Sequence, residues 1–282
     1  MNNTTDPRPI LLTGGTGKTG RRVAERLEAL GLPVRIGSRR ADPPFDWDEP
    51  DTWAAALDGA RAVYVTYAPD IAFQGGADAV DAFVRQAVAA GARRVVVLTG
   101  RGEEEAEHAE ELVKASGANW TIVRCAVFAQ NFDEGVLVES VQAGALAMPA
   151  GDVAEPFVDV EDIADVVTAA LTDDRHIGQL YELTGPRLLT FHEAMAEVSE
   201  ALGRPVQYVP VSSEEFLAEL RGAGMPEDEA TGLTDLFAAI FDGRNQSLAD
   251  GMQRALGRPP RDFAEYARRA AATGAWDPSP VS

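Results

Sequence analysis

Short apolar runs alternate with longer helical patterns through the first half of the chain, and this alternation constrains the fold more than any other feature. The runs are rich in β-branched residues and predict strands over residues 10–13, 34–38, 62–66, 94–99 and 120–124. Apolar residues at helical spacing predict helices over residues 18–30, 52–57, 77–90 and 103–116. Such alternation builds a parallel sheet with helices on both faces. The first half therefore predicts an α/β fold of the Rossmann type, with a doubly wound parallel sheet.

The pattern changes after residue 124. Residues 157–171 read as a short strand followed by a helix, and residues 180–184 as a further strand. From about residue 190 the chain is mostly helical, and only the segment QYVPV has β character. We expect one domain over residues 1–130, completed by about 155–184. Residues 131–154 and 185–282 are expected to form a smaller, mainly helical part beside the carboxyl edge of the sheet, where open α/β folds bind ligands.

Composition excludes several functional classes. The 282 residues include 45 acidic and 25 basic ones, a net charge of −20 that would repel nucleic acid. No apolar run reaches the length of a membrane span, and the polar start lacks the layout of a secretory signal, so we expect a cytoplasmic protein without membrane contact. The single Cys125 excludes an intrachain disulfide, and the scattered His108, His176 and His192 have no metal-ligand spacing. We expect no metal.

The segment LLTGGTGKTG, residues 11–20, suits two kinds of phosphate site. A nucleoside triphosphate P-loop ending in Lys18 and Thr19 would need glycine at residue 12, which is Leu12. Gly14, Gly17 and Gly20 instead have the spacing of a dinucleotide-binding turn between a strand and a helix. The pyrophosphate would lie on the free N–H groups of the helix that begins near Lys18.

The end of the second predicted strand indicates which dinucleotide binds. NAD-binding proteins typically place an acidic residue there for the ribose hydroxyl, whereas this chain has Ser38, Arg39 and Arg40. A hydroxyl and two guanidinium groups can hold a 2′-phosphate through charge-assisted hydrogen bonds. The sequence therefore favours NADP(H), although a solvated basic turn would have the same letters.

Several segments together resemble a known family. TGGTGKTG, SRR, FDWDEPDTW, RRVVVLTG, SGANWTIVRCAVFAQNF and FVDVEDIA are similar to the NmrA-like branch of atypical short-chain dehydrogenase/reductases, and within it to the agroclavine and festuclavine dehydrogenase group and its bacterial relatives. The likeness covers nearly the whole chain. It is specific for fold and cofactor, and much less so for substrate.

The resemblance implies a role for residues along the whole carboxyl edge of the sheet. The residues that it places against NADP(H) are Gly14, Gly15, Thr16, Gly17, Lys18, Thr19, Gly20, Ser38, Arg39, Arg40, Asp46, Trp47, Thr66, Ala68, Pro69 and Gly100. Thr99 would lie beside the nicotinamide with Gly100, and residues 125–131 would close over it. Trp47 can equally be a packing residue, and Cys125 reads as a small core residue rather than a nucleophile.

The usual acid of the wider superfamily is missing. Typical members use Tyr-x-x-x-Lys to protonate a developing alkoxide, but no tyrosine here has a lysine four residues on, and by the family pattern those positions fall near Gly102 and Ala106. Two hypotheses remain. The protein reduces a small apolar cyclic acceptor, an iminium or a quinone-like ring, or it is a non-catalytic NADP(H)-binding redox sensor that acts through a protein partner.

For the enzyme, Thr99 and Tyr67 are the candidate catalytic residues. Phe128, Asn131 and Phe132 are the candidate substrate-binding residues, with the C-terminal helices completing an apolar wall. The acidic run EEEAEHAEE, residues 103–111, reads as a solvated helix start rather than a metal site or proton relay. The chain is expected to be a monomer or homodimer.

Overall fold

A computed structural model describes residues 6–73, 75–135 and 137–277, which form two compact units. Unit 1 comprises Met1–Cys125, Val160–Leu183 and Asp250–Arg258, and unit 2 comprises Ala126–Asp159, Thr184–Ala249 and Pro259–Ser282. The division differs from the expected one at its boundaries and in one helix. Residues 126–130 and 155–159 belong to unit 2, and helix α10 (Gly251–Leu256) belongs to unit 1 although it lies within the helical C-terminal third of the sequence.

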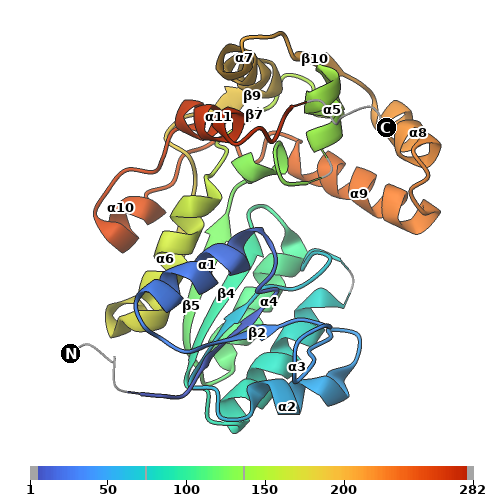
Figure 1. Cartoon of the computed structure of the whole chain (residues 1–282). Coiled ribbons are helices and arrows are strands. Elements are labelled where there is room, and N and C mark those ends of the chain that lie inside the picture. The colour runs from blue at the N-terminus through green and yellow to red at the C-terminus, as the bar shows by residue number, and fades with distance from the viewer. Residues whose placement is uncertain (1–5, 74, 136, 278–282) are drawn as a thin grey trace. The chain divides into compact units, whose positions relative to one another are not determined.

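Unit 1 contains a parallel sheet of six strands in the order β2-β1-β3-β4-β5-β8 (Figure 1). The strands are β1 (Ile10–Thr13), β2 (Val34–Gly37), β3 (Ala62–Val65), β4 (Arg94–Gly100), β5 (Asn119–Cys125) and β8 (Gln179–Leu183). Each lies within one residue of its predicted bounds. The strand order reverses between β1 and β3, and open α/β sheets bind ligands at the carboxyl ends of the strands at such a point.

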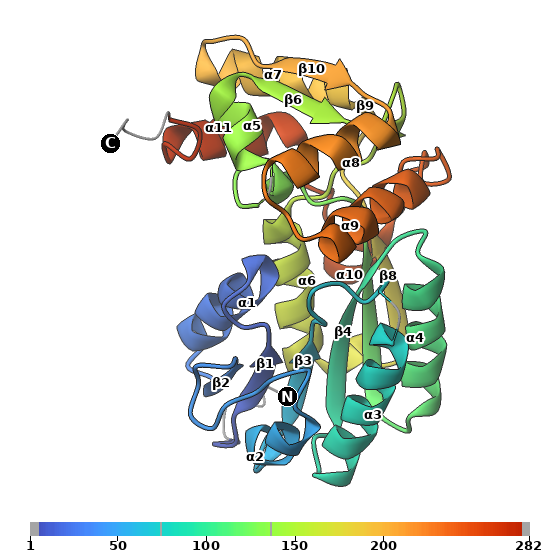
Figure 2. The same ribbon diagram turned by 90° about the vertical axis from the view of Figure 1, so that its right-hand side faces the viewer.

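Helices cover both faces of this sheet, which confirms the doubly wound fold (Figure 2). Helix α1 (Lys18–Ala29) packs against α6 (Val160–Thr172) on one face. On the other, α2 (Trp53–Leu57), α3 (Gly76–Ala89) and α4 (Glu104–Ala115) cover an apolar layer of strand residues. Because helices cover both faces, most positions of the strands are apolar, as their sequences predicted. Two short 3-10 turns, Pro50–Thr52 and Asp174–His176, complete the unit.

Unit 2 is mainly helical, with two small sheets. Its helices are α5 (Val138–Ala143), α7 (Phe191–Leu202), α8 (Ser213–Gly222), α9 (Glu227–Ile240) and α11 (Phe263–Ala272), with a 3-10 turn at Ala129–Asn131. The QYVPV segment forms β10 (Gln207–Pro210), which pairs in parallel with β6 (Ala145–Met148), and β7 (Ala154–Glu155) pairs with β9 (Leu189–Thr190). The strand expected at the start of residues 157–171 is instead a single bridge between Phe128 and Val158.

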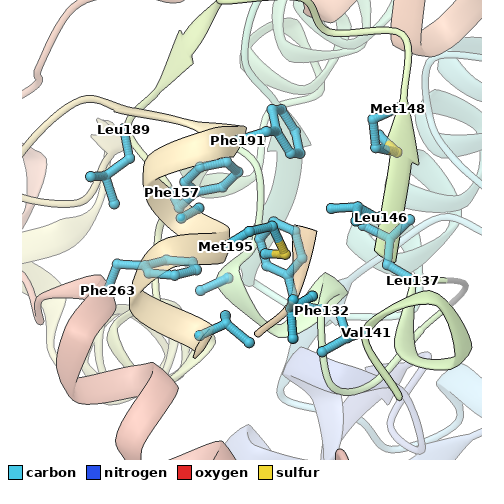
Figure 3. Close-up of a cluster of buried hydrophobic side chains, with 14 of the residues drawn as sticks. Phe132, Leu137, Val141, Leu146, Met148, Phe157, Leu189, Phe191, Met195 and Phe263 are labelled. Carbon is cyan, nitrogen blue, oxygen red and sulfur yellow. The ribbon is translucent and has the colours of Figure 1, made fainter. Parts of the chain in front are cut away.

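An aromatic cluster forms the core of unit 2 (Figure 3). The Phe132 ring meets Phe157, Phe191 and Phe263 in edge-to-face contacts, with centroids 5.4 to 6.0 Å apart. The carbonyl of Phe132 also accepts a 2.7 Å hydrogen bond from the buried Trp276 indole. Such aromatic pairs contribute about 1 kcal/mol each beyond the burial of their area. Phe132 therefore anchors the fold of unit 2.

No described helix combines the length and the apolar character that a membrane span requires. Within the same described ranges, no three histidine, cysteine, aspartate or glutamate side chains gather as a metal site would need.

Candidate functional site

The turn between β1 and α1 has a shape that only glycine permits. Gly14 has φ +62°, and its carbonyl accepts the N–H of Gly17 at 2.8 Å. A Cβ at Gly20 would lie 2.3 Å from that same carbonyl oxygen, and a Cβ at Gly14 would lie 2.2 Å from the Thr66 hydroxyl. The glycines at 14 and 20 are therefore required by the close approach of the turn to α1 and to the end of β3.

The N-terminus of α1 is open. Its N-cap, Gly17, makes no side-chain capping hydrogen bond, and its first turn carries no acidic residue. Thr16 and Gly17 are exposed, Lys18 is half-buried, and Gly15 is buried. Thr19 differs from these because its hydroxyl is buried and accepts a 3.0 Å hydrogen bond from Tyr64. The exposed end of α1 is thus suited to bind an anion.

Two arginines follow β2 at the same edge of the sheet. The last residues of β1 and β2, Thr13 and Gly37, are paired, so the glycine turn and the segment after Gly37 leave the sheet together. The Ser38 carbonyl accepts the N–H groups of Ala41 and Phe45, which folds this segment into a compact loop. Arg39 and Arg40 are exposed, and no carboxylate among the described residues pairs with either.

Trp47 belongs to an aromatic cluster beside β3. Its indole N–H donates to the Thr66 carbonyl at 3.1 Å, and its ring contacts Phe45, Trp53, Tyr67 and Phe83 at centroid distances of 5.0 to 5.7 Å. The carbonyl of Asp46 accepts the indole N–H of Trp53 at 2.8 Å. The packing role that the sequence allowed for Trp47 is therefore present.

The end of β3 is tied to β1 by paired threonines. The Thr66 hydroxyl donates to the Thr13 carbonyl at 2.8 Å, and the Thr66 N–H donates to the Thr13 hydroxyl at 2.9 Å. Beyond it, Tyr67 is half-buried, and Ala68 and Pro69 are exposed. Burial, with a smaller contribution from the negative charge of Asp48, raises the pKa of Tyr67. Tyr67 is therefore a weaker acid than a free tyrosine.

The hydroxyl of Thr99 is committed to a buried carboxylate. Thr99 is 3% exposed and donates to Glu110 of α4 at 2.8 Å. Both oxygens of Glu110 also accept from the guanidinium of Arg124, at the end of β5. Arg101 pairs with Glu182 at 2.7 Å nearby, and Glu182 lies 3.8 Å from Arg124. Thr99 therefore belongs to an ionic network that joins β4, β5, β8 and α4.

A second carboxyl group at this edge has a different environment. Glu103 precedes α4 and lies directly on Gly100, where a Cβ would be 2.1 Å from either carboxyl oxygen. Its Oε2 is buried without a hydrogen-bond partner. Burial first, and the negative charge of Asp70 second, raise the pKa of Glu103 to about 8. At neutral pH the group is therefore largely an uncharged acid.

These positions correct the interpretation of the acidic run. Residues 103–111 were expected to be a solvated helix start, yet Glu110 is 1% exposed and Glu103 is partly buried. The sequence did carry a signal for this burial. Residues at the spacing of one helical face are Glu103, Ala106, Glu110 and Val113. The interpretation does hold for Glu104, Glu105 and Glu107, which are exposed in the first turn.

The three candidate substrate residues lie in unit 2. Phe128 is half-buried and bridges to Val158, and its carbonyl accepts the N–H of the half-buried Asn131 at 3.1 Å. Phe132 is fully buried in the aromatic core of its own unit. Phe128 and Asn131 thus retain exposed surface, whereas Phe132 has none.

The sequence matches that of a described family over most of its length. The NmrA-like family matches residues 44–267. The chain belongs to the NmrA-like family. This membership confirms the resemblance that the sequence motifs carried.

Relatives of this NmrA-like chain are similar over almost their whole length. An NAD(P)H azoreductase of Xenophilus azovorans is 34% identical, covering 94% of this chain and 99% of the relative. An agroclavine dehydrogenase of Claviceps fusiformis is 30% identical, covering 91% and 95%. An NADPH-dependent quinone oxidoreductase from Escherichia coli, solved with NADPH, shares the fold with a TM-score of 0.74 at 21% identity, covering 92% and 99%.

The family resemblance implies that the superfamily acid and its lysine would fall near Gly102 and Ala106. Gly102 has φ +77° in the turn after β4, and Ala106 is fully buried on α4. Neither can donate a proton through its side chain. If the site moves a proton, another group at this edge must supply it.

Proposed function

We propose that this protein is an NADPH-dependent oxidoreductase that delivers hydride to a small, apolar cyclic acceptor, either an iminium or a quinone-like ring. The observation that carries the proposal is the pair of uncommitted guanidinium groups, Arg39 and Arg40, beside the open N-terminus of α1. Two anion-binding features at one edge of the sheet suit the two phosphate positions of NADPH, the pyrophosphate and the 2′-phosphate.

The residues present fit that cofactor. Gly14 to Gly20 would hold the pyrophosphate, and Ser38 with Arg39 and Arg40 would hold the 2′-phosphate. Asp46, Trp47, Thr66, Ala68 and Pro69 would follow the adenosine half. When bound, NADPH supplies a hydride from its nicotinamide. The relatives support this proposal, since one is named as an NAD(P)H azoreductase and one as a dehydrogenase of agroclavine.

The acceptor would be held by shape rather than by a tyrosine–lysine pair. Tyr67 retains exposed surface at the end of β3, and Phe128 and Asn131 retain it in unit 2. In unit 1, Tyr67 would position the ring for hydride uptake, a contribution that proximity and orientation make large. Phe132 would support Phe128 and Asn131 from the core, and Thr99 would act through Glu110 rather than on the acceptor itself.

Cofactor preference is tested by titration. NADPH and NADH binding would be followed by fluorescence for wild type, Arg39→Ala and Arg40→Ala. Loss of a charge-assisted bond to the 2′-phosphate should weaken NADPH binding by about tenfold or more, and NADH binding by less than about twofold. The matched control is Arg93→Ala, an exposed arginine next to the amino end of β4. Equal losses for both dinucleotides would contradict the 2′-phosphate role.

A turnover measurement distinguishes the oxidoreductase from the redox sensor. Consumption of NADPH would be followed by its absorbance with cyclic iminium and quinone acceptors. We expect turnover with at least one class. Tight NADPH binding without turnover by any acceptor would instead favour the redox sensor, in which cofactor occupancy is passed to a protein partner.

A further inference from the structure

Glu103 lies next to Gly102, near which the family resemblance places the tyrosine acid of the wider superfamily. Its carboxyl group covers Gly100, the last residue of β4. Gly100 pairs in register with Cys125, the last residue of β5, and the Arg101 N–H donates to the Cys125 carbonyl at 3.0 Å. The carboxyl therefore lies over the carboxyl ends of β4 and β5, at the edge of the sheet where doubly wound folds bind their ligands.

This carboxyl has no structural task within the described chain. Glu103 is the N-cap of α4, yet its side chain makes no capping hydrogen bond. No described residue donates to either of its oxygens, and Oε2 is sealed from solvent. A buried carboxylate without donors is costly, so the position favours the protonated form.

The groups around Glu103 act in the same direction. Asp70, after β3, adds a negative charge, and burial raises the pKa of Asp70 as well. Cys125 lies close enough for the charge of Glu103 to contribute to the raised pKa of its thiol, after burial. The N-terminus of α4 would favour an anion, but burial outweighs it, because the pKa rises rather than falls.

We propose that Glu103 is the proton donor of this enzyme, and that its acceptor is consequently a ring that becomes anionic on taking up hydride, such as a quinone, rather than an iminium ion. This inference rests on the proposed oxidoreductase function and assigns its acceptor class. A protonated acid has no use for an iminium, because hydride addition to that carbon gives a neutral amine directly.

The step balances as follows. When bound, NADPH would supply a hydride, with its two electrons, to the quinone and would leave as NADP⁺. The oxyanion that forms on the ring takes the proton of Glu103, so the O–H bond of Glu103 breaks and a new O–H bond forms on the product. Water then returns a proton to Glu103. One quinone, one NADPH and one proton are consumed for each hydroquinone and NADP⁺.

The first experiment compares two acceptors in two matched variants. Glu103→Gln has nearly the same size but cannot act as an acid, whereas Glu104→Gln changes the exposed neighbour. Turnover of menadione and of an N-methylated dihydroisoquinolinium salt would be measured with saturating NADPH, after subtraction of the nonenzymatic rate. For Glu103→Gln we expect menadione turnover to fall about 100-fold and iminium turnover to fall by much less. Glu104→Gln should match wild type.

Each outcome decides a different claim. Wild-type turnover of menadione that Glu103→Gln retains would overturn the donor role while leaving the proposed oxidoreductase intact. A larger loss with the iminium salt would mean that Glu103 and Asp70 act as carboxylates that hold a cation, which would overturn the acceptor class. No wild-type turnover of any acceptor, with NADPH bound, would overturn the proposed function and the donor with it.

The second measurement needs neither cofactor nor turnover. Infrared difference spectra of cofactor-free wild type and Glu103→Gln would isolate the C=O band of the protonated Glu103 carboxyl. We expect this band at neutral pH, with a titration midpoint near 8. Asp70→Asn removes the neighbouring charge and should lower that midpoint, and the alkaline limb of the menadione pH profile should move with it. A Glu103 that is ionised at neutral pH would overturn the proposal.

Discussion

Two glutamates of one helical face, Glu103 and Glu110, meet opposite conditions at the same edge of the sheet. Glu110 is more deeply buried, yet Thr99 and Arg124 satisfy both of its oxygens. Glu103 is less buried and has no donor at all. Burial alone therefore does not determine what a carboxyl does, because its partners decide whether the charged form is retained.

This difference separates a structural role, that of Glu110, from the catalytic role proposed for Glu103. A carboxylate enclosed by a guanidinium and a hydroxyl holds strands together. A carboxyl with a raised pKa and no partner can release and regain one near neutral pH. Glu110 thus belongs to the framework of unit 1, and Glu103 belongs to its proposed active site. Stability measurements on the two side chains test this assignment directly.

The largest expected effect is that of Glu110→Gln. The change leaves the Arg124 guanidinium without its buried counter-charge, and we expect the free energy of unfolding to fall by at least about 2 kcal/mol. Urea denaturation measures it. The matched control is Glu107→Gln, 3.6 Å from Arg124 but 54% exposed, which should cost less than about 0.5 kcal/mol. Equal effects of the two variants would mean that the buried pair stabilises no more than a surface one.

The second effect is that of Thr99→Val. Valine has the shape of threonine without the hydroxyl, so Glu110 loses one donor and keeps Arg124. We expect a loss of about 1.5 kcal/mol, typical of a hydrogen bond to a charged group, and Thr99→Ser should recover most of it. A loss of turnover much larger than the loss of stability would instead restore Thr99 to the direct catalytic role that the sequence suggested.

The sequence predicted the sheet well because its signals are local. Strand β1 was predicted to the residue, since Pro9 precedes it and the glycine turn follows it. Pairings between distant segments were less accessible: β6 was missed because ALAM resembles its helical surroundings, and it forms a strand only against β10. Helix α10 has an ordinary amphipathic pattern, and nothing in it shows that its Gly251 packs on the Glu182 carbonyl of β8.

The sequence predicted those site residues whose identity depends on backbone geometry. It predicted less well the residues whose role depends on side chains from other strands. The spacing of Gly14, Gly17 and Gly20 reports a close backbone approach, which leaves few alternatives to glycine. The roles of Glu103 and Glu110 depend on Arg124, which comes from another strand. A count of acidic letters could not separate the two, although their shared face with Ala106 and Val113 could have marked them as buried.

The effect expected of Glu103→Gln has the opposite sign and a distinctive pH dependence. The pKa of Glu103 rises from 4.5 to about 8 on folding. Between these values the folded chain holds a proton that the unfolded chain has lost, so wild-type stability falls as the pH rises through this window and levels off above it. Glutamine cannot ionise, so the variant escapes this loss.

We therefore expect cofactor-free Glu103→Gln to melt about 2 °C or more above wild type at mildly alkaline pH, with the difference shrinking towards pH 4.5. Scanning calorimetry across this pH range measures it. Glu110→Gln should be destabilised throughout the same range, because Arg124 remains charged. If Glu103→Gln were destabilised at alkaline pH, Glu103 would be a paired anion like Glu110. The difference between the two side chains, which supports Glu103 as the proton donor, would then be absent.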